Sequence, residues 1–211
     1  MPTDADIQAL FEWQRTPAFA ENVARLDCEA GVDLLTSRSL KPLREALILR
    51  DFATTLGFAE CRLCPSDFPD GEVRNPRSKE RQVEITEVLT PGRKRDEEYR
   101  RFKHNPSESK TAHHEWEEVE QSGSNWIAWM LDGVKKKLKY DKNSQFDIVV
   151  YNNIDHLWEL PDILKLSAAV GALMIESGYP EHWVWQVRAT TVDLLWPRVL
   201  RLRIPNWQDR F

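Results

Sequence analysis

The sequence predicts an α/β protein in which helices flank a central mixed β-sheet. The segment at 81–89 alternates polar and apolar residues, as a half-buried strand does, and the near-continuous apolar run FDIVVYNN at 146–153 suits a central strand covered on both faces. Helical periodicity alternates with strands along the chain, which is typical of a layered sheet. The predicted strands lie at 59–64, 71–75, 81–89, 146–153 and within 183–204, and the predicted helices at 4–33, 40–57, 126–140 and 160–177.

Length and composition favour one domain over residues 1–211. A chain of 211 residues that is 41% hydrophobic and 30% charged is long enough for one full core and short for two. We divide it into a helical N-terminal cap at 1–36, a core at 40–153 and a C-terminal helix with a tryptophan-rich strand at 154–211. No stretch approaches about 18 consecutive apolar residues and the start lacks the order of a signal peptide, so we expect a cytoplasmic protein that binds no membrane.

The three cysteines are too few and too irregular for a disulfide framework, which fits a reducing compartment. Cys61 and Cys64 form a CxxC pair, and three histidines follow within 104–114, so a zinc site is formally possible. We do not favour it, because the CxxC pair falls within a predicted strand and the histidine spacing matches no standard zinc site.

Helix boundaries are marked by residues that start or stop helices. The N-terminal helical region has a predicted break near Thr16–Pro17. Ser39 is the candidate N-cap of the helix at 40–57, and Gly57 ends it. From 91 to 124 the periodicity fails, and the many charged residues and histidines predict a long loop, which in a compact protein is often functional.

The net charge of −5 gives no overall attraction to nucleic acid, but two segments are basic. The segment 93–103 carries six bases against three acids, and the segment 135–142 carries five bases against one acid. Each segment is equally compatible with an ordinary solvated surface and with contacts to phosphate groups.

Glu45 interrupts the apolar stripe of the helix at 40–57. On a 3.6-residue period it falls in line with Leu49, Phe52 and Leu56, so a carboxylate sits among apolar side chains. A charge in that position needs a partner. Either Glu45 forms a buried salt bridge, for example to an arginine, or it has a metal-binding or catalytic role.

Asp70 and Glu84 are the candidate metal-binding acids. Glu84 lies on the strand at 81–89, where it projects to the same side as Thr86. Asp70 comes fourteen residues earlier, a separation that a hairpin returns to nearly the same place. Mg²⁺ takes oxygen ligands, usually one or two carboxylates with water and substrate phosphate, and this pair of acids would supply them.

The order of these features resembles the PD-(D/E)XK nuclease superfamily, which has the restriction-endonuclease-like fold. A helix and a strand precede Pro69-Asp70, Glu84-Ile85-Thr86 lies on the next strand, and a lysine-rich helix and a buried strand follow. The resemblance covers about residues 40–153, a little over half the chain. It implies that Asp70 and Glu84 bind Mg²⁺ or Mn²⁺, and that Glu45 matches the acid that many members carry on the first core helix.

This chain departs from the family pattern at Thr86, where most members have a lysine that positions or activates the attacking water. In some members that lysine comes from another element, often the following helix. On the helix at 126–140, Lys135 and Lys137 border the apolar face on opposite sides and Lys136 points outward. We expect Lys135 to be the substitute, with Lys137 as the second choice.

The resemblance implies a metal-dependent phosphodiester hydrolase, a nuclease, with nucleic acid as partner, DNA rather than RNA, and a homodimer as one possible assembly. Because of Thr86, a second hypothesis is a nuclease-fold protein that has lost activity and serves in nucleic-acid binding or regulation. A third is a small α/β interaction protein whose resemblance is accidental. The residues expected to clamp the nucleic-acid backbone are Arg93, Lys94, Arg95, Arg100, Arg101 and Lys137.

Overall fold

A mixed eight-stranded β-sheet, with its strands in chain order, runs through the part of the protein that the structure describes. The computed structural model describes residues 1–31, 33–89, 126–140, 146–153, 160–187, 191–197 and 200–203. The strands are β1 (Gln14–Arg15), β2 (Glu60–Leu63), β3 (Gly71–Arg74), β4 (Arg81–Leu89), β5 (Phe146–Asn153), β6 (Trp183–Val187), β7 (Thr191–Trp196) and β8 (Leu200–Arg203). β5 pairs in parallel with both of its neighbours, β4 and β6, and every other neighbouring pair is antiparallel.

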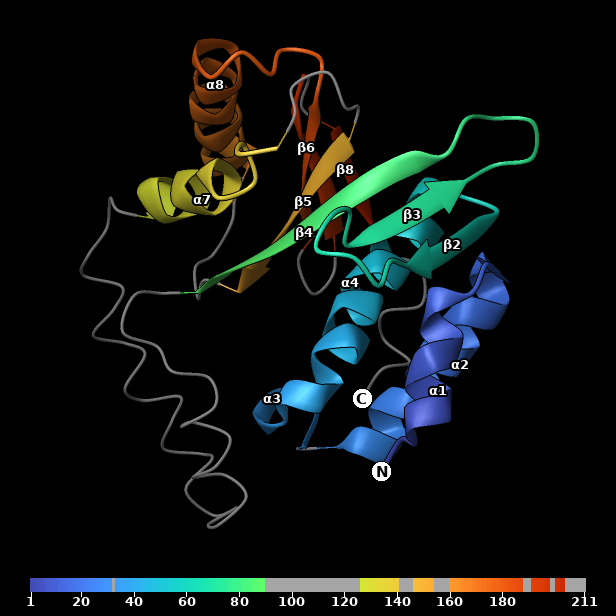
Figure 1. Ribbon diagram of the computed structural model, residues 1–211. Helices are drawn as coiled ribbons and strands as arrows, with labels where there is room; N and C mark the ends of the chain where they lie inside the picture. The colour runs from blue at the N-terminus through green and yellow to red at the C-terminus, as the bar shows by residue number, and fades with distance from the viewer. Residues whose placement is uncertain are drawn as a thin grey trace.

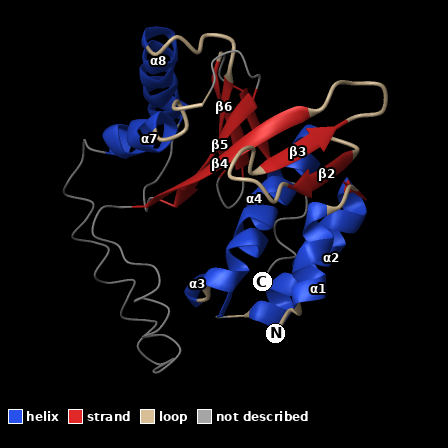
Figure 2. Cartoon of the chain, viewed as in Figure 1, coloured by secondary structure: helices blue, strands red, loops and turns tan. Residues whose placement is uncertain are grey.

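Helices cover both faces of this sheet (Figures 1 and 2), so the expected α/β class with a central mixed sheet is confirmed. They are α1 (Asp4–Gln8), α2 (Thr16–Ala30), α3 (Asp33–Thr36), α4 (Lys41–Leu56), α7 (Trp126–Lys135) and α8 (Leu160–Glu176), with 3₁₀ turns η1 (Ala9–Phe11) and η2 (Arg38–Leu40). One hydrophobic cluster joins α2 and α4 to the sheet, and a second joins α7 and α8 to the opposite face. Among the described helices none is long and apolar enough to span a membrane.

The two ends of the chain differ from the sequence-based description. The predicted break near Thr16–Pro17 is confirmed, because α2 begins at Thr16, but the cap also contains a strand, β1, which pairs with β2 and was not expected. The tryptophan-rich region forms three strands rather than one. β6 runs parallel to β5, and β7 and β8 return antiparallel. The region 183–204 contains no glycine and one proline, so it offers few of the residues that mark turns between strands.

The N-cap of α4 was predicted wrongly and its end correctly. Leu40, not Ser39, is the N-cap, and it makes no side-chain capping bond. Ser39 lies in the preceding 3₁₀ turn, where its hydroxyl is 2.7 Å from that of Ser37. Gly57 ends the helix in the left-handed conformation, with a φ of 69°, which glycine adopts without a steric penalty.

The helix predicted at 126–140 stops at Lys135. The amide of Lys137 donates to the carbonyl of Val134 at 2.9 Å, and that of Leu138 donates to the carbonyl of Lys135 at 3.1 Å. These are bonds to the third preceding residue, which tighten the chain into turns after a helix. Side chains after Lys135 therefore do not continue the helical periodicity.

α7 packs closely on β4 because a glycine lies at the contact. A Cβ atom at Gly133 would lie 2.4 Å from Cγ2 of Val88 on β4, a distance at which one of the two elements must shift. Val88 belongs to the hydrophobic cluster between α7 and the sheet. This contact fixes the height of α7 above β4, and with it the position of the turn that follows α7.

We predict that Gly133→Ala lowers the free energy of unfolding by about 1–3 kcal/mol, because the added methyl group overpacks the contact with Val88. Urea denaturation measures the change. In a Val88→Ala background the same substitution should lower the free energy of unfolding much less, because the Cγ2 methyl of Val88 that it would clash with is absent. Asp132→Ala, on the exposed side of the same helix, is the control, and its free energy of unfolding should stay within about 0.5 kcal/mol of the parent's. An equal cost of Gly133→Ala in both backgrounds would contradict this account of the contact.

Candidate active site

The site begins where β3 stops pairing with β4. The register aligns Gly71 with Val83, so β3 leaves the edge of β4 just before Ile85. There the amide of Ile85 donates to Oδ2 of Asp70 at 2.7 Å. The carboxylate of Asp70 thus takes the place of the next backbone acceptor along β3, which holds this side chain against β4.

Asp70 and Glu84 meet at one ammonium group. Nζ of Lys137 lies 2.9 Å from Oδ2 of Asp70 and 2.7 Å from Oε2 of Glu84. The side chains of Lys137, Asp70 and Glu84 are only 15%, 12% and 0% exposed. Charge-assisted hydrogen bonds are strong in a buried environment that excludes water. These bonds join the residue before β3, the middle of β4 and the turn after α7.

Lys137, and not Lys135, reaches the two acids. Nζ of Lys135 lies 3.8 Å from Oδ1 of Asp132 on the outer side of α7, and 57% of its side chain is exposed. Helical periodicity ranked the two lysines in the wrong order because α7 ends at Lys135 and the tight turn beyond it directs Lys137 toward β4.

Glu45 lies in the same cavity as Asp70 but is paired with a lysine one helical turn away. Its Oε1 is 3.0 Å from Nζ of Lys41. α4 comes close to the sheet beside Asp70 because a Cβ at Gly71 would lie 2.9 Å from Cδ2 of Leu49, four residues after Glu45. Among the described residues, no three His, Cys, Asp or Glu side chains lie close enough together to hold a metal ion, so Glu45 does not complete a three-residue metal site with Asp70 and Glu84.

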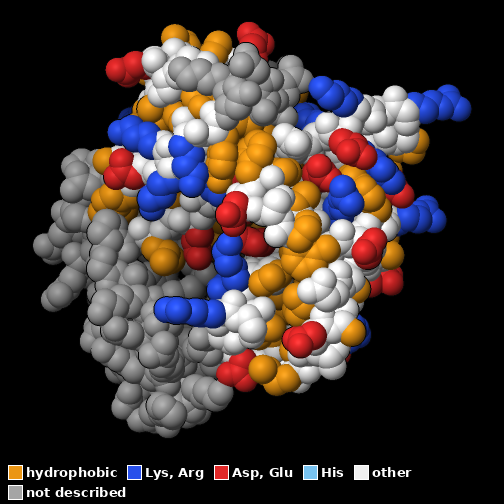
Figure 3. All heavy atoms as spheres, viewed as in Figure 1, with side chains coloured by type: hydrophobic (Ala, Val, Ile, Leu, Met, Phe, Trp, Pro, Cys, Tyr) orange, Lys and Arg blue, Asp and Glu red, His pale blue; other side chains and the backbone are white. Residues whose placement is uncertain are grey.

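A cavity of about 690 Å³ opens beside these groups, between α4, the edge of β4 and the turn after α7. Acidic and basic side chains lie together in the hollow between α7 and α4 (Figure 3). The cavity is lined by Lys41, Arg44, Glu45, Ile48, Asp70, Ile85, Thr86, Glu87, Lys136, Lys137 and Lys139.

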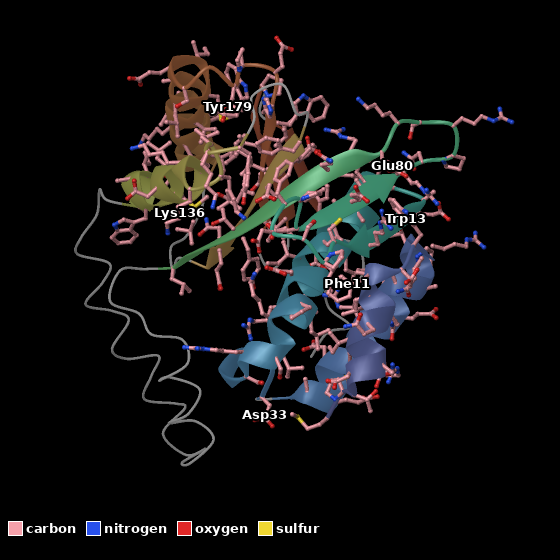
Figure 4. The ribbon with its side chains drawn as sticks, in the orientation of Figure 1. Phe11, Trp13, Asp33, Glu80, Lys136 and Tyr179 are labelled. Carbon is pink, nitrogen blue, oxygen red and sulfur yellow. The ribbon has the colours of Figure 1, made fainter. Side chains whose placement is uncertain are left out.

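Four of these basic residues were not expected at the site: Lys41, Arg44, Lys136 and Lys139. Lys136, labelled in Figure 4 at the end of α7, was predicted to point outward, and it lines the cavity because the helix has already ended. Two signals in the sequence pointed to three of them. Lys41 lies one turn before Glu45, and Lys136 and Lys139 belong to the basic run at 135–142.

Burial and neighbouring charges shift the pKa values of Glu45, which lines the cavity, and of Glu84, which is buried beside it. Burial raises the pKa of Glu84 to about 7, and the charge of Asp70 adds to this, while the bond to Lys137 opposes it. Burial also raises the pKa of Glu45, against the effect of Lys41. Burial alone would lower the pKa of Lys137, but its bonds to Glu84 and Asp70 raise it above the ordinary value.

Aromatic side chains fix the turn that carries Lys137. Tyr179, labelled in Figure 4, donates its hydroxyl to the carbonyls of Leu138, at 2.7 Å, and of Tyr140. The ring of Tyr140 packs on that of Phe68, with centroids 4.3 Å apart. Phe68 comes two residues before Asp70, so the same contacts hold the segment with the acid and the turn with the lysine together.

The remaining sequence-predicted residues are placed as follows. Thr86 is buried on the face of β4 that meets α7, and it also lines the cavity. The predicted clamp residues Arg93, Lys94, Arg95, Arg100 and Arg101 lie outside the described residues, as does the histidine-containing segment 104–114.

Comparisons with protein-family models, with curated proteins and with solved structures find no match for this chain. Functional conclusions therefore depend on the geometry and chemistry of the cavity itself.

We predict that Glu84→Gln stabilises the protein at neutral and alkaline pH. The pKa of Glu84 is about 7 in the fold against an ordinary value of 4.5, so the folded state binds the extra proton and ionisation of Glu84 costs stability as the pH rises between these values. The variant and the parent should have equal free energies of unfolding near pH 4. At pH 8 the free energy of unfolding of the variant should be higher by about 1–3 kcal/mol.

Urea unfolding at a series of pH values measures this difference. Glu21→Gln, at an exposed position of α2, is the control and should change stability by less than about 0.5 kcal/mol at each pH. A loss of stability in Glu84→Gln at every pH would mean that the ionised carboxylate is needed to hold the fold.

Proposed function

We propose that this protein is a metal-dependent phosphodiester hydrolase that acts on nucleic acid. The observation that carries the proposal is the pair of buried carboxylates, Asp70 and Glu84, held against Lys137 at the side of a basic cavity. The chain order α4, β2, β3, β4, α7, β5, with β4 and β5 parallel, agrees with a restriction-endonuclease-like core.

The donor set fits a hard divalent cation. Asp70 and Glu84 offer carboxylate oxygens, and Oε1 of Glu84 is buried with no hydrogen-bond partner among the described residues. Mg²⁺ takes one or two carboxylates and completes its shell with water and substrate oxygens, so a third protein ligand is not required. We infer that these two side chains hold Mg²⁺ or Mn²⁺, while Glu45, which lines the same cavity, stays paired with Lys41. Such an ion polarises a phosphate and lowers the pKa of a bound water.

Lys137 takes the part of the lysine that Thr86 replaces. An ammonium group has three N–H donors, and described residues accept two of them from Lys137. The third can donate to a water or to a phosphate oxygen in the cavity. In that position Lys137 orients the attacking water or offsets the negative charge that develops on the phosphate in the transition state.

The charge of the cavity favours an anionic substrate. Its lining holds five basic side chains and three acidic ones, although the whole chain carries a net charge of −5. Lys136 and Lys139 are exposed on one wall, and the exposed Lys41 lies on the other. Cations on two walls of an open cavity suit a phosphodiester backbone passing between them.

A nucleic-acid-binding protein without catalytic activity is the second candidate. Thr86 favours it, because the usual lysine is missing from β4 and the ammonium of Lys137 already occupies one oxygen of each acid. The two candidates share the cavity and its basic walls, and they differ in whether metal-dependent cleavage occurs.

We predict that Lys137→Ala lowers Mg²⁺-dependent cleavage by about 10²–10⁴-fold, while the affinity for nucleic acid falls far less. Single-turnover cleavage of labelled single-stranded DNA, duplex DNA and RNA, with Mg²⁺ or Mn²⁺, gives the rates. Asp70→Ala should abolish cleavage and also the binding of Mn²⁺ measured by calorimetry.

Lys135→Ala is the matched control, since this lysine lies two residues away and faces solvent; its rate should equal that of the parent. Equal losses in the two lysine variants would remove Lys137 from the mechanism. If the parent cleaves none of the three substrates with either metal, the hydrolase proposal fails and the binding protein replaces it.

We predict that the double substitution Lys136→Ala/Lys139→Ala weakens nucleic-acid binding and flattens its dependence on salt. The slope of log K against log [salt] should fall in magnitude by about 0.7–0.9 for each phosphate that the variant no longer neutralises. Fluorescence anisotropy over a salt series measures both the affinity and the slope. Lys79→Ala, in the exposed turn between β3 and β4, is the control and should change neither. If the cavity variant and the turn variant bind alike, nucleic acid does not bind along these walls.

A further inference from the structure

α8 carries large apolar side chains on the side away from the sheet. Its inner face is buried in the core through Ile163, Leu166 and Met174. On its outer face Leu164 and Ile175 are 51% and 61% exposed. Within the described part of the chain the only other exposed large hydrophobic residue is Met1, so the exposed apolar side chains concentrate on this helix.

The exposed residues form a stripe along one face of α8. Leu164, Ala168, Ala172 and Ile175 follow one another at intervals of four, four and three residues, which places them in line on a helix. The two alanines are exposed, and the larger side chains stand at the two ends of the stripe. A helix with small residues between two large ones can receive a second helix at close range.

Charges beside the stripe are arranged for an antiparallel copy. Lys165 and Glu176 both lie on the same flank of the stripe, and both are exposed. The midpoints of Leu164 and Ile175, of the two alanines, and of Lys165 and Glu176 all fall within half a residue of position 170. A two-fold rotation about that point puts Leu164 beside the partner's Ile175 and Lys165 beside the partner's Glu176.

We propose that α8 is the interface of a homodimer, in which it packs antiparallel against α8 of a second copy of this chain. An isologous interface requires a surface that is complementary to itself under a two-fold rotation, and the apolar and charged residues of α8 both meet that requirement. An unrelated partner would not require the midpoints to coincide. One helix pair buries little area, so the dimer is weak and depends on concentration in the micromolar range.

The interface is separate from the proposed active site. α8 lies at the edge of the molecule in Figure 1 and supplies none of the residues that line the cavity. A dimer through α8 therefore leaves both cavities open, and its existence does not depend on the proposed hydrolase activity.

Sedimentation equilibrium from nanomolar to high micromolar protein tests the interface. The mass should rise from that of one chain, 24.7 kDa, toward twice that value. Ala168→Glu puts a carboxylate in the middle of the stripe and should raise the dimer dissociation constant by at least about tenfold. Ala24→Glu, at an exposed alanine of α2, is the matched control and should leave it unchanged.

A charge exchange tests the antiparallel arrangement. Lys165→Glu and Glu176→Lys should each weaken the dimer by about 3- to 10-fold, because each variant places like charges side by side twice. The double variant Lys165→Glu/Glu176→Lys restores opposite charges and should return to the parent's dissociation constant. A parent that stays monomeric at every concentration, a dimer unaffected by Ala168→Glu, or a double variant no tighter than the single ones would each overturn the proposal.

Discussion

The contact of the Lys137 ammonium with the carboxylates of Asp70 and Glu84 is the interaction on which the candidate site depends. Two carboxylates this close and this buried repel each other, and a cation between them offsets the cost. The three residues come from three places in the chain: the position before β3, the middle of β4 and the turn after α7. Any change that moves one of these elements separates charges that are expensive to leave unpaired in the interior.

Backbone features of both faces of the sheet place these elements. On one face, Gly71 lets α4 approach and brings Glu45 toward the cavity. On the other, Gly133 lets α7 rest on β4, and the hydroxyl of Tyr179 holds the turn that contains Lys137. Because β3 is short, no described strand pairs with this side of β4 beyond Ile85, and the cavity forms there. Close packing and an incomplete strand pair are thus the structural conditions for the site.

Most of the fold follows from local patterns in the sequence. Alternation predicts β4, the apolar run predicts β5, and Gly57 ends α4 where the pattern indicates. The spacing of Asp70 and Glu84 in a hairpin also suffices to bring their side chains together. Local patterns did not predict where α7 ends, because the residues after Lys135 are still compatible with a helix. The turn that follows α7 is stabilised by Tyr179, which lies about forty residues further along the chain. For that reason Lys135 ranked above Lys137, and Lys136 and Lys139 were not expected to line a cavity.

The central claim is that Asp70 and Glu84 hold a divalent cation with Lys137 beside them. Crystals soaked in Mn²⁺ and measured at the manganese absorption edge test it most directly. The account predicts an anomalous peak bound by oxygens of both carboxylates, with the Lys137 ammonium adjacent. A Mn²⁺-saturated crystal that shows no peak at these acids, with Lys137 still bridging them, would contradict it.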